Sequence, residues 1–471
     1  MARFFRHPER RQRQLLPVDM VDWLPEGDIV HLIVDAVGLM DLSEFEAAYR
    51  IGVAGQAPFA PGMLLTLLIY AYSHGNRSSR VIERLCGRDA GYRFIVGAEV
   101  PDHTVIARFR RRHVEQMGGV FLAVLELCRE AGLVRLGLVA LDGTKVRANA
   151  ALEANRTAAT IAEQIARMLA EAEARDASED HQSAARYDDQ LPGELSCPTD
   201  RLARLRRCHD KLQRRAAAAA AGQQEKLDAR AAAEQAKGKR QRGRKPKPPD
   251  AAVEPDMVAN VSDPDSGIMK TRRGWVQGYN AQVVVTPEQI ILAADLTTQA
   301  NDVRQLTPML DQALANVETV MGEEAVLGAA VADAGYWSEA NAEAATEECE
   351  LFIATQKDHK QRAALRQAAP PRGRMRKSMT ARERMQRKLR TKRGRALYRQ
   401  RGASVEPVFG QMKDRQGADR FSMRGLDRCR GEWRLDAAVH NLRKLHRESV
   451  RRSKMPADRR RDARGTANQA A

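Results

Sequence analysis

The fold is decided by the stretch Leu136-Gly137-Leu138-Val139-Ala140-Leu141-Asp142. Its short run of Leu and Val is typical of a strand that is buried inside a sheet. Gly143 follows directly, and an Asp-Gly pair predicts that the strand ends there in a turn. The sequence before residue 130 reads as helical, so a new domain begins with this strand.

Further strands are predicted C-terminal to this one. Residues 274–285 alternate in polarity and residues 290–294 are apolar, with a turn at residues 287–289, which together predict a β-hairpin. The segments that follow are a helix over 302–317, a strand over 325–332, a short helix over 338–348 and a strand over 350–355. Hairpin strands followed by βαβ units predict an α/β fold, in which helices flank a mixed sheet with an antiparallel edge.

Helical segments precede and interrupt this core. Within the first of them, residues 78–87 and 102–128 read as a helix-turn-helix-like pair, for which an ordinary helical hairpin is the alternative. The expected order is a helical N-terminal DNA-binding domain over 1–130, the first core strand over 131–150, a helical and partly low-complexity insertion over 151–260, the rest of the core over 261–450 and a disordered basic tail over 451–471.

The composition favours a polyanionic partner. The chain of 471 residues has 78 Lys and Arg against 61 Asp and Glu, a net charge of +17, and such a balance attracts nucleic acid. Its six cysteines form no C-x-x-C pair, which argues against structural zinc and disulfides. The longest strongly apolar stretch, residues 63–72, is about half the length of a membrane span. We therefore expect a cytoplasmic protein that binds double-stranded DNA and no membrane.

Two segments concentrate positive charge. The first holds the candidate DNA-binding residues Arg108, Arg110, Arg111 and Arg112. The second, residues 361–401, has sixteen Lys or Arg against one acid, Glu383. Neutralising phosphates with such residues gives a binding affinity that falls steeply with salt. The alternative for each segment is a solvated charged face without a partner.

Three acids are expected to meet at one edge of the sheet. Asp142 and Asp333 end predicted strands, and Glu406 lies near the predicted start of a helix. Active sites of α/β folds lie at the carboxyl ends of strands, and carboxylate oxygens suit Mg²⁺ or Mn²⁺, two of which can assist phosphoryl displacement. Taken singly, the three acids could instead belong to a turn, a loop start and a helix cap. Asp302, with Asn301, is expected to cap a helix.

Several motifs resemble one known family. They are Ser78-Ser79-Arg80, Asp102-His103-Thr104, Phe109-Arg110-Arg111-Arg112-His113, Leu141-Asp142-Gly143-Thr144-Lys145, Gln277-Gly278-Tyr279-Asn280-Ala281-Gln282, Ala332-Asp333-Ala334-Gly335-Tyr336 and Val405-Glu406-Pro407-Val408-Phe409-Gly410-Gln411-Met412-Lys413. Over about residues 15–450 the sequence resembles the DDE transposases of bacterial insertion sequences. The resemblance implies a ribonuclease-H-like core behind a helical transposase N-terminal domain.

The resemblance also implies roles for particular residues. Asp142, Asp333 and Glu406 would be the catalytic triad that binds two Mg²⁺ or Mn²⁺ ions, and Lys413 would assist catalysis. The family pattern Tyr-x2-Arg-x3-Glu-x6-Lys is matched by Tyr398, Arg401, Glu406 and Lys413, except that four residues rather than three separate Arg401 from Glu406. Glu406 and Lys413 can share a helix face, whereas Arg401 is expected to precede a helix break at Gly402. Tyr398, Arg401 and Lys413 are further candidate DNA contacts.

The function implied is that of an insertion-sequence transposase. It would bind terminal inverted repeats and catalyse metal-dependent strand cleavage and strand transfer, as a homodimer on DNA and associated with the bacterial nucleoid when bound. Two alternatives remain open: a metal-dependent DNA nuclease without strand transfer, and a catalytically silent DNA-binding protein on the same scaffold.

Overall fold

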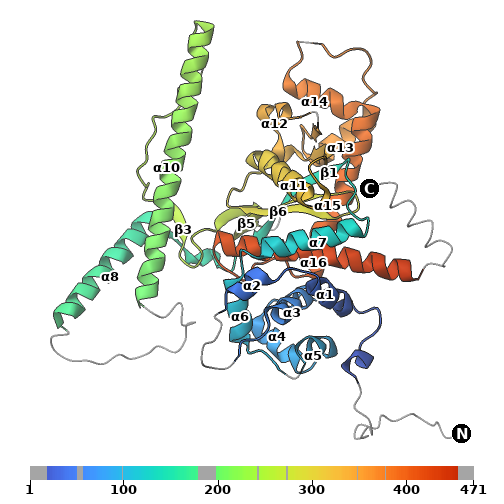
Figure 1. Ribbon diagram of the computed structural model, residues 1–471. Coiled ribbons are helices and arrows are strands. Elements are labelled where there is room, and N and C mark those ends of the chain that lie inside the picture. Colours follow the sequence, from blue (N-terminus) through green and yellow to red (C-terminus); the bar gives the residue numbers. More distant parts are fainter. Residues whose placement is uncertain are drawn as a thin grey trace, which may run out of the picture.

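The computed structural model describes residues 19–49, 57–97, 99–178, 198–240, 243–271, 274–346, 348–376 and 378–454 (Figure 1). Most of the expected basic tail, from residue 455 on, and residues 179–197 of the expected insertion lie outside these ranges. Residues 451–453, which were expected to belong to the tail, form the last turn of a long helix instead.

A mixed sheet of six strands forms the centre of the molecule. Its strands are β1 (Val139–Arg147), β4 (Gly267–Thr271), β5 (Gly274–Val285), β6 (Ile291–Thr297), β7 (Gly328–Ala332) and β8 (Cys349–Ile353). The order is β4-β5-β1-β7-β8, and β6 pairs with β5 on the same edge as β4. β5 is antiparallel to its neighbours, whereas β1, β7 and β8 are parallel. The predicted α/β class, the mixed sheet and the hairpin are confirmed.

β1 extends beyond the point where the sequence predicts a turn. Its parallel pairing with β7 ends at Leu141, opposite Ala332. Its antiparallel pairing with β5 continues through Gly143, opposite Gln282, as far as Arg147. The predicted turn at Asp142-Gly143 is therefore wrong, because the long partner strand β5 carries the ladder past the glycine.

Helices cover both faces of the sheet (Figure 1). They include α11 (Leu306–Met321), α12 (Glu339–Glu343), α13 (Asp358–Gln367), α14 (Ala381–Arg390), α15 (Lys392–Arg415) and α16 (Leu426–Ser453). α11 and α16 contact β6, whereas α15 contacts β1 and β7. α15 passes through Gly402 and Pro407 without a break. The expected break at Gly402, and a helix start near Glu406, are wrong because one continuous face of α15 is buried against the sheet.

The described residues between 19 and 130 form helices and no strand. They are η1 (Met20–Trp23), α1 (Ile29–Gly38), α2 (Ser43–Ala47), α3 (Pro61–Ser73), α4 (Ser79–Cys86), α5 (Ala90–Val96), α6 (His103–Arg112) and α7 (Met117–Glu130). The expected helix-turn-helix-like pair differs in detail, because α5 lies between its two members and the second divides into α6 and α7. α7 packs along α16, so one hydrophobic core joins the N-terminal helices to the sheet.

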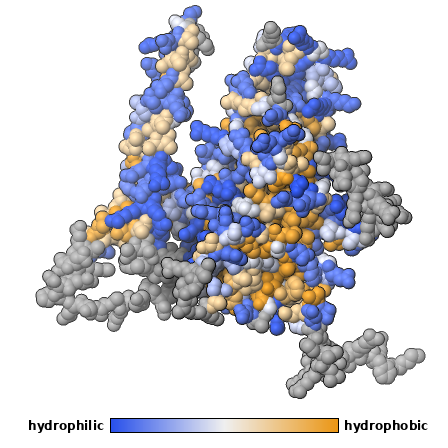
Figure 2. All heavy atoms as spheres, in the orientation of Figure 1, coloured by the Kyte–Doolittle hydropathy of each residue, from blue (hydrophilic) through white to orange (hydrophobic). Residues whose placement is uncertain are grey.

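An arm projects between β1 and β4. It consists of α8 (Ala158–Ser178), α10 (Pro198–Lys237) and a two-stranded ribbon of β2 (Asn155–Thr157) and β3 (Val258–Asn260). α8 contacts α10. A small hydrophobic cluster around Ile161, Leu205 and Leu212 holds the arm together, separately from the main core. Figures 1 and 2 show the upper part of α10 standing clear of the body, with hydrophilic and mildly hydrophobic residues mixed on its visible surface.

Candidate active site

Two of the three predicted acids lie side by side at the sheet. Leu141 of β1 pairs with Ala332 of β7, so Asp142 and Asp333 follow at the same edge of two parallel strands. Each carboxylate is fixed locally: Asp142 Oδ1 accepts a hydrogen bond from Gly143 N at 2.8 Å, and Asp333 Oδ1 accepts one from Gly335 N at 2.8 Å. The register of β1 and β7 therefore brings two carboxylates together.

Both aspartates have raised pKa values, because burial disfavours their charged forms. Burial raises the pKa of Asp142 to about 6; Arg401 opposes this shift and the charge of Asp333 adds to it. Burial also raises the pKa of Asp333, again against the effect of Arg401. Neighbouring carboxylates that are withdrawn from water favour protonation unless a cation compensates them. A further positive charge beside the two carboxylates would therefore be favourable.

Arg401 is one of two cations that the protein itself supplies to this group, and the other is Lys145, whose Nζ lies 3.6 Å from Asp302 Oδ1. The guanidinium of Arg401 is 6 % exposed and lies 2.8 Å from Asp142 Oδ2 and 3.8 Å from Asp358 Oδ1. The hydroxyl of Tyr398, one helical turn earlier, donates to Asp358 at 2.9 Å. The prediction that Tyr398 and Arg401 contact DNA is corrected here, because both side chains are buried and their polar groups face protein carboxylates.

Glu406, the third predicted acid, lies apart from the aspartates. Its side chain is 61 % exposed and its carboxylate pairs with Arg362 at 3.0 Å. Lys413 lies seven residues later, on the same face of α15. Its ammonium donates to Thr144 Oγ1 at 2.6 Å and to the carbonyl of Lys145 at 3.1 Å. The face that carries Glu406 is therefore anchored to β1 just beyond Asp142.

Asp302 is an acid whose place the sequence analysis missed. Asp302 occupies the N-cap position of the following helix without a side-chain capping hydrogen bond, and it is Asn301 Oδ1 that accepts from Val303 N. Asp302 Oδ1 instead accepts from Asn280 Nδ2 at 2.6 Å and from Gln282 Nε2 at 2.8 Å. Its charge raises the pKa values of both aspartates of the pair. The signal that could have found it is the i, i+2 spacing of two amide side chains on one strand face.

Two glycines make room for this group of carboxylates. A Cβ at Gly143 would lie 2.8 Å from Asp302 Oδ1 and 3.1 Å from Asn280 Oδ1. A Cβ at Gly335 would lie 2.9 Å from Asp333 Oδ1 and 3.2 Å from Asp302 Oδ2. Asn280 Oδ1 is buried without a hydrogen-bond partner. Carboxylate oxygens that lie close together, with an amide carbonyl that lacks a hydrogen bond, are the kind of ligand that a hard divalent cation prefers.

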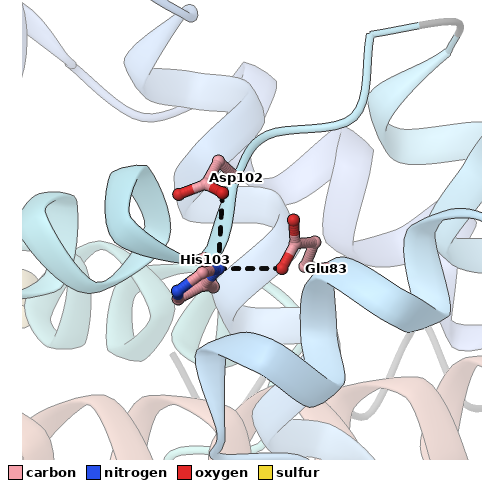
Figure 3. Close-up of side chains that lie close together, drawn as sticks. All are labelled: Glu83, Asp102 and His103. Atoms are coloured by element: carbon pink, nitrogen blue, oxygen red, sulfur yellow. Dashed lines mark hydrogen bonds and ion pairs between the residues drawn. The ribbon is translucent and has the colours of Figure 1, made fainter. Parts of the chain in front are cut away.

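A different set of side chains has the tightest geometry for a metal among the described residues (Figure 3). Glu83, Asp102 and His103 are the only three of their kind there whose ligand atoms lie within 4.8 Å of one another. His103 Nδ1 lies 3.0 Å from Glu83 and 3.3 Å from Asp102, and Asp102 caps α6 by accepting from Thr104 N. These contacts explain the group as a link between α4 and α6 without an ion.

The four arginines of α6 differ in their exposure. Arg108, Arg111 and Arg112 are exposed. Arg110 is 8 % exposed, and its guanidinium donates to Tyr72 Oη at 3.1 Å, to the carbonyl of Arg77 at 2.8 Å and to Ser422 Oγ at 3.0 Å. The prediction that Arg110 contacts DNA is corrected, because its donors serve protein acceptors.

Comparison with known proteins finds two family matches. Residues 252–442 match the model described as "Transposase DDE domain", and residues 18–112 match the one described as "Transposase domain (DUF772)". The first match includes Asp302, Asp333 and Glu406 but begins after Asp142. No curated protein and no solved structure matches the chain. No helix within the described residues is long and apolar enough to span a membrane.

Proposed function

Since the chain belongs to the DDE transposases, we propose that it moves an insertion sequence. It binds the terminal inverted repeats, hydrolyses a phosphodiester at the element end and joins the freed 3′-hydroxyl to target DNA. The observation that carries this proposal is the pairing of Leu141 with Ala332, which sets Asp142 beside Asp333 at the edge of the sheet. Cutting two element ends makes a homodimer on DNA the natural assembly.

The residues at this edge suit the divalent ions that such enzymes use. Asp142 and Asp333 would hold them, with Asp302 and the unpartnered Asn280 Oδ1 beside the pair and Glu406 as the third acid of the family pattern. Oxygen donors favour Mg²⁺ or Mn²⁺ over softer metals. When bound, two such ions stabilise the attacking and leaving oxygens of an in-line displacement.

The protein's own residues orient the acids. Arg401 fixes Asp142 through a buried ion pair, and Lys413 fixes the Glu406 face of α15 against β1. Glu406 breaks its exposed ion pair with Arg362 and turns toward the two aspartates. This movement costs little free energy, because surface ion pairs are worth at most about 1 kcal/mol. All three acids are present, which argues against a silent DNA-binding scaffold.

The test uses the full-length chain, Mg²⁺ and a labelled duplex that carries the element end. Wild type should produce both cleaved and joined DNA. Asp333→Asn should abolish both products while duplex binding persists, since only one oxygen donor is replaced. Asp311→Asn, an exposed aspartate on α11, is the matched control and should behave like wild type. Cleavage without joining would instead establish a nuclease, and binding with neither product would refute the catalytic assignment.

A further inference from the structure

A basic cleft lies where four parts of the chain meet. It has a volume of about 690 Å³ and lies between the end of α6, the N-terminal part of α10, residues 262–265 and residues 424–428. Figure 1 shows the lower part of α10 level with α6, across from the body. Seven basic residues line the cleft: Arg111, Arg204, Arg207, Lys211, Arg214, Arg424 and Arg428.

The four basic residues on α10 form a stripe along one face of the helix. They recur at intervals of three, four and three residues from Arg204 to Arg214, which keeps them in line. Leu205, Cys208 and Leu212 are fully buried on the neighbouring face, against α8 and β3. The apolar contacts therefore fix the rotation of α10, so that the four basic residues of the stripe face the cleft.

Two acids of the cleft, Asp263 and Asp265, have partners within the protein. Asp263 accepts from Tyr279 Oη and from Gly425 N, at 2.8 and 3.1 Å. Asp265 accepts from Leu426 N at 3.2 Å and pairs with Lys211 at 3.3 Å. These contacts hold residues 424–428 in place. Four acids against seven basic residues leave the cleft with excess positive charge.

We propose that this cleft binds the sugar-phosphate backbone of duplex DNA, so that the arm clamps the DNA against α6. The proposal rests on the proposed function and gives the insertion a role in it. From residue 204 to 214 the stripe spans about 15 Å, a length over which duplex DNA carries about nine phosphate charges. Six of the seven basic residues are arginines, whose planar guanidinium groups pair with phosphate in a bidentate manner. Arg111, an exposed residue at the end of α6, brings that helix into the lining of the cleft.

The experiment compares two double variants of α10 in the full chain. Arg207→Ala with Arg214→Ala removes two exposed residues of the stripe, and Arg206→Ala with Lys226→Ala removes two equally exposed residues that do not line the cleft. None of the four belongs to the proposed catalytic site. Binding to a fluorescent mixed-sequence duplex of about 40 base pairs is measured over a range of salt concentrations, since each phosphate contact contributes about 0.9 to the slope of log affinity against log salt.

The stripe variant should lower that slope by about 1.8, so that the loss of affinity between about 50 and 200 mM salt becomes about tenfold smaller. The control variant should keep the wild-type slope, and both should keep the wild-type unfolding midpoint. If the stripe variant keeps the wild-type slope, while wild type binds and cleaves the element end, the cleft does not bind the DNA backbone but the proposed function stands. Wild type that neither binds nor cleaves DNA would remove both proposals.

A competition experiment tests whether the cleft binds an acidic protein instead of DNA. Polyglutamate, at the same concentration of charge as the duplex, should compete weakly and to the same extent with wild type and the stripe variant. If it displaces the duplex from wild type and loses this ability with the stripe variant, the cleft serves an acidic polypeptide and the DNA proposal is wrong.

Discussion

Gly143→Ala should disable the carboxylate site while the rest of the fold survives. The added Cβ would lie inside van der Waals contact with Gln282 Nε2 and 2.8 Å from Asp302 Oδ1. Gln282 cannot swing away, because its amide donates to Asp302 and accepts from the hydroxyl of the buried Tyr336. The strain therefore falls on Asp302 and on the strand that carries Asp142.

The size of the effect follows from these distances. Since Gln282 is held in place, the backbone at residue 143 must move by about 1 Å from Gln282 Nε2, and Asp302 by about 0.6 Å, to regain ordinary contacts of 3.4 Å. Forcing one methyl group into a packed site costs about 1–3 kcal/mol of folding free energy. Misplacing reactive groups by about 1 Å costs about 100-fold in rate. We expect a cleavage rate lowered by about 100-fold in a protein that still unfolds cooperatively.

The assay pairs denaturant unfolding with cleavage of a labelled element end. Gly119→Ala in α7 is the control, because a Cβ at Gly119 meets nothing within 4 Å and alanine stabilises a helix by about 0.5–1 kcal/mol over glycine. That variant should be at least as stable as wild type and fully active. A Gly143→Ala protein with wild-type stability and rate would refute the described packing around Asp302, whereas a variant that fails to fold would contradict the expectation that the strain stays within the site.

Three further predictions concern single side chains. Asp302→Asn should weaken Mn²⁺ binding, measured by calorimetry, at least tenfold. The exposed control Asp311→Asn should bind Mn²⁺ like wild type. If Asp302→Asn also binds Mn²⁺ with the wild-type affinity, Asp302 is not part of the metal site. Burial lowers the pKa of His440 from 6.5 to about 4, so the unfolded state alone binds a proton as the pH falls below 6.5, and stability is lost. His440→Gln should therefore remove about 2 kcal/mol of the loss in unfolding free energy between about pH 7.5 and pH 5; an unchanged acid slope would contradict the burial. Arg77→Met should lower the free energy of unfolding, measured by denaturant titration, by about 3–5 kcal/mol, because it leaves two fully buried carboxylates without their cation. Arg147→Met, at an exposed ion pair, should lower it by less than about 1 kcal/mol.

The sheet and its aspartate pair could be predicted because their signals are local. Short apolar runs mark β1 and β7, and an acid directly follows the last paired residue of each in the parallel ladder. The continuation of β1 past Gly143 could not be predicted, because the turn preference of Asp-Gly is local whereas the pairing with β5 joins residues far apart in sequence. In the same way, packing against the sheet overrides the local signals for a break in α15.

The parts of the site that were missed depend on which way side chains point. Arginine density in α6 does not reveal that Arg110 faces inward to Tyr72. The role of Asp302 depends on amide side chains about twenty residues earlier in the sequence, which reach it only once β5 is paired. A capping role explains Asn301 and Asp302 equally well from the sequence, and the two neighbours are distinguished only by tertiary contacts.

If Asp142 and Asp333 hold divalent metal for DNA strand cleavage, a change of ligand type at Asp333 should change which metal supports the reaction. A thiolate is a softer ligand than a carboxylate, so Asp333→Cys should bind Mg²⁺ poorly and accept Mn²⁺ more readily. Cleavage of the element end by this variant should be lost in Mg²⁺ and restored in Mn²⁺, while wild type cleaves in both. Equal loss in both metals, or activity in Mg²⁺ that matches wild type, would contradict the account.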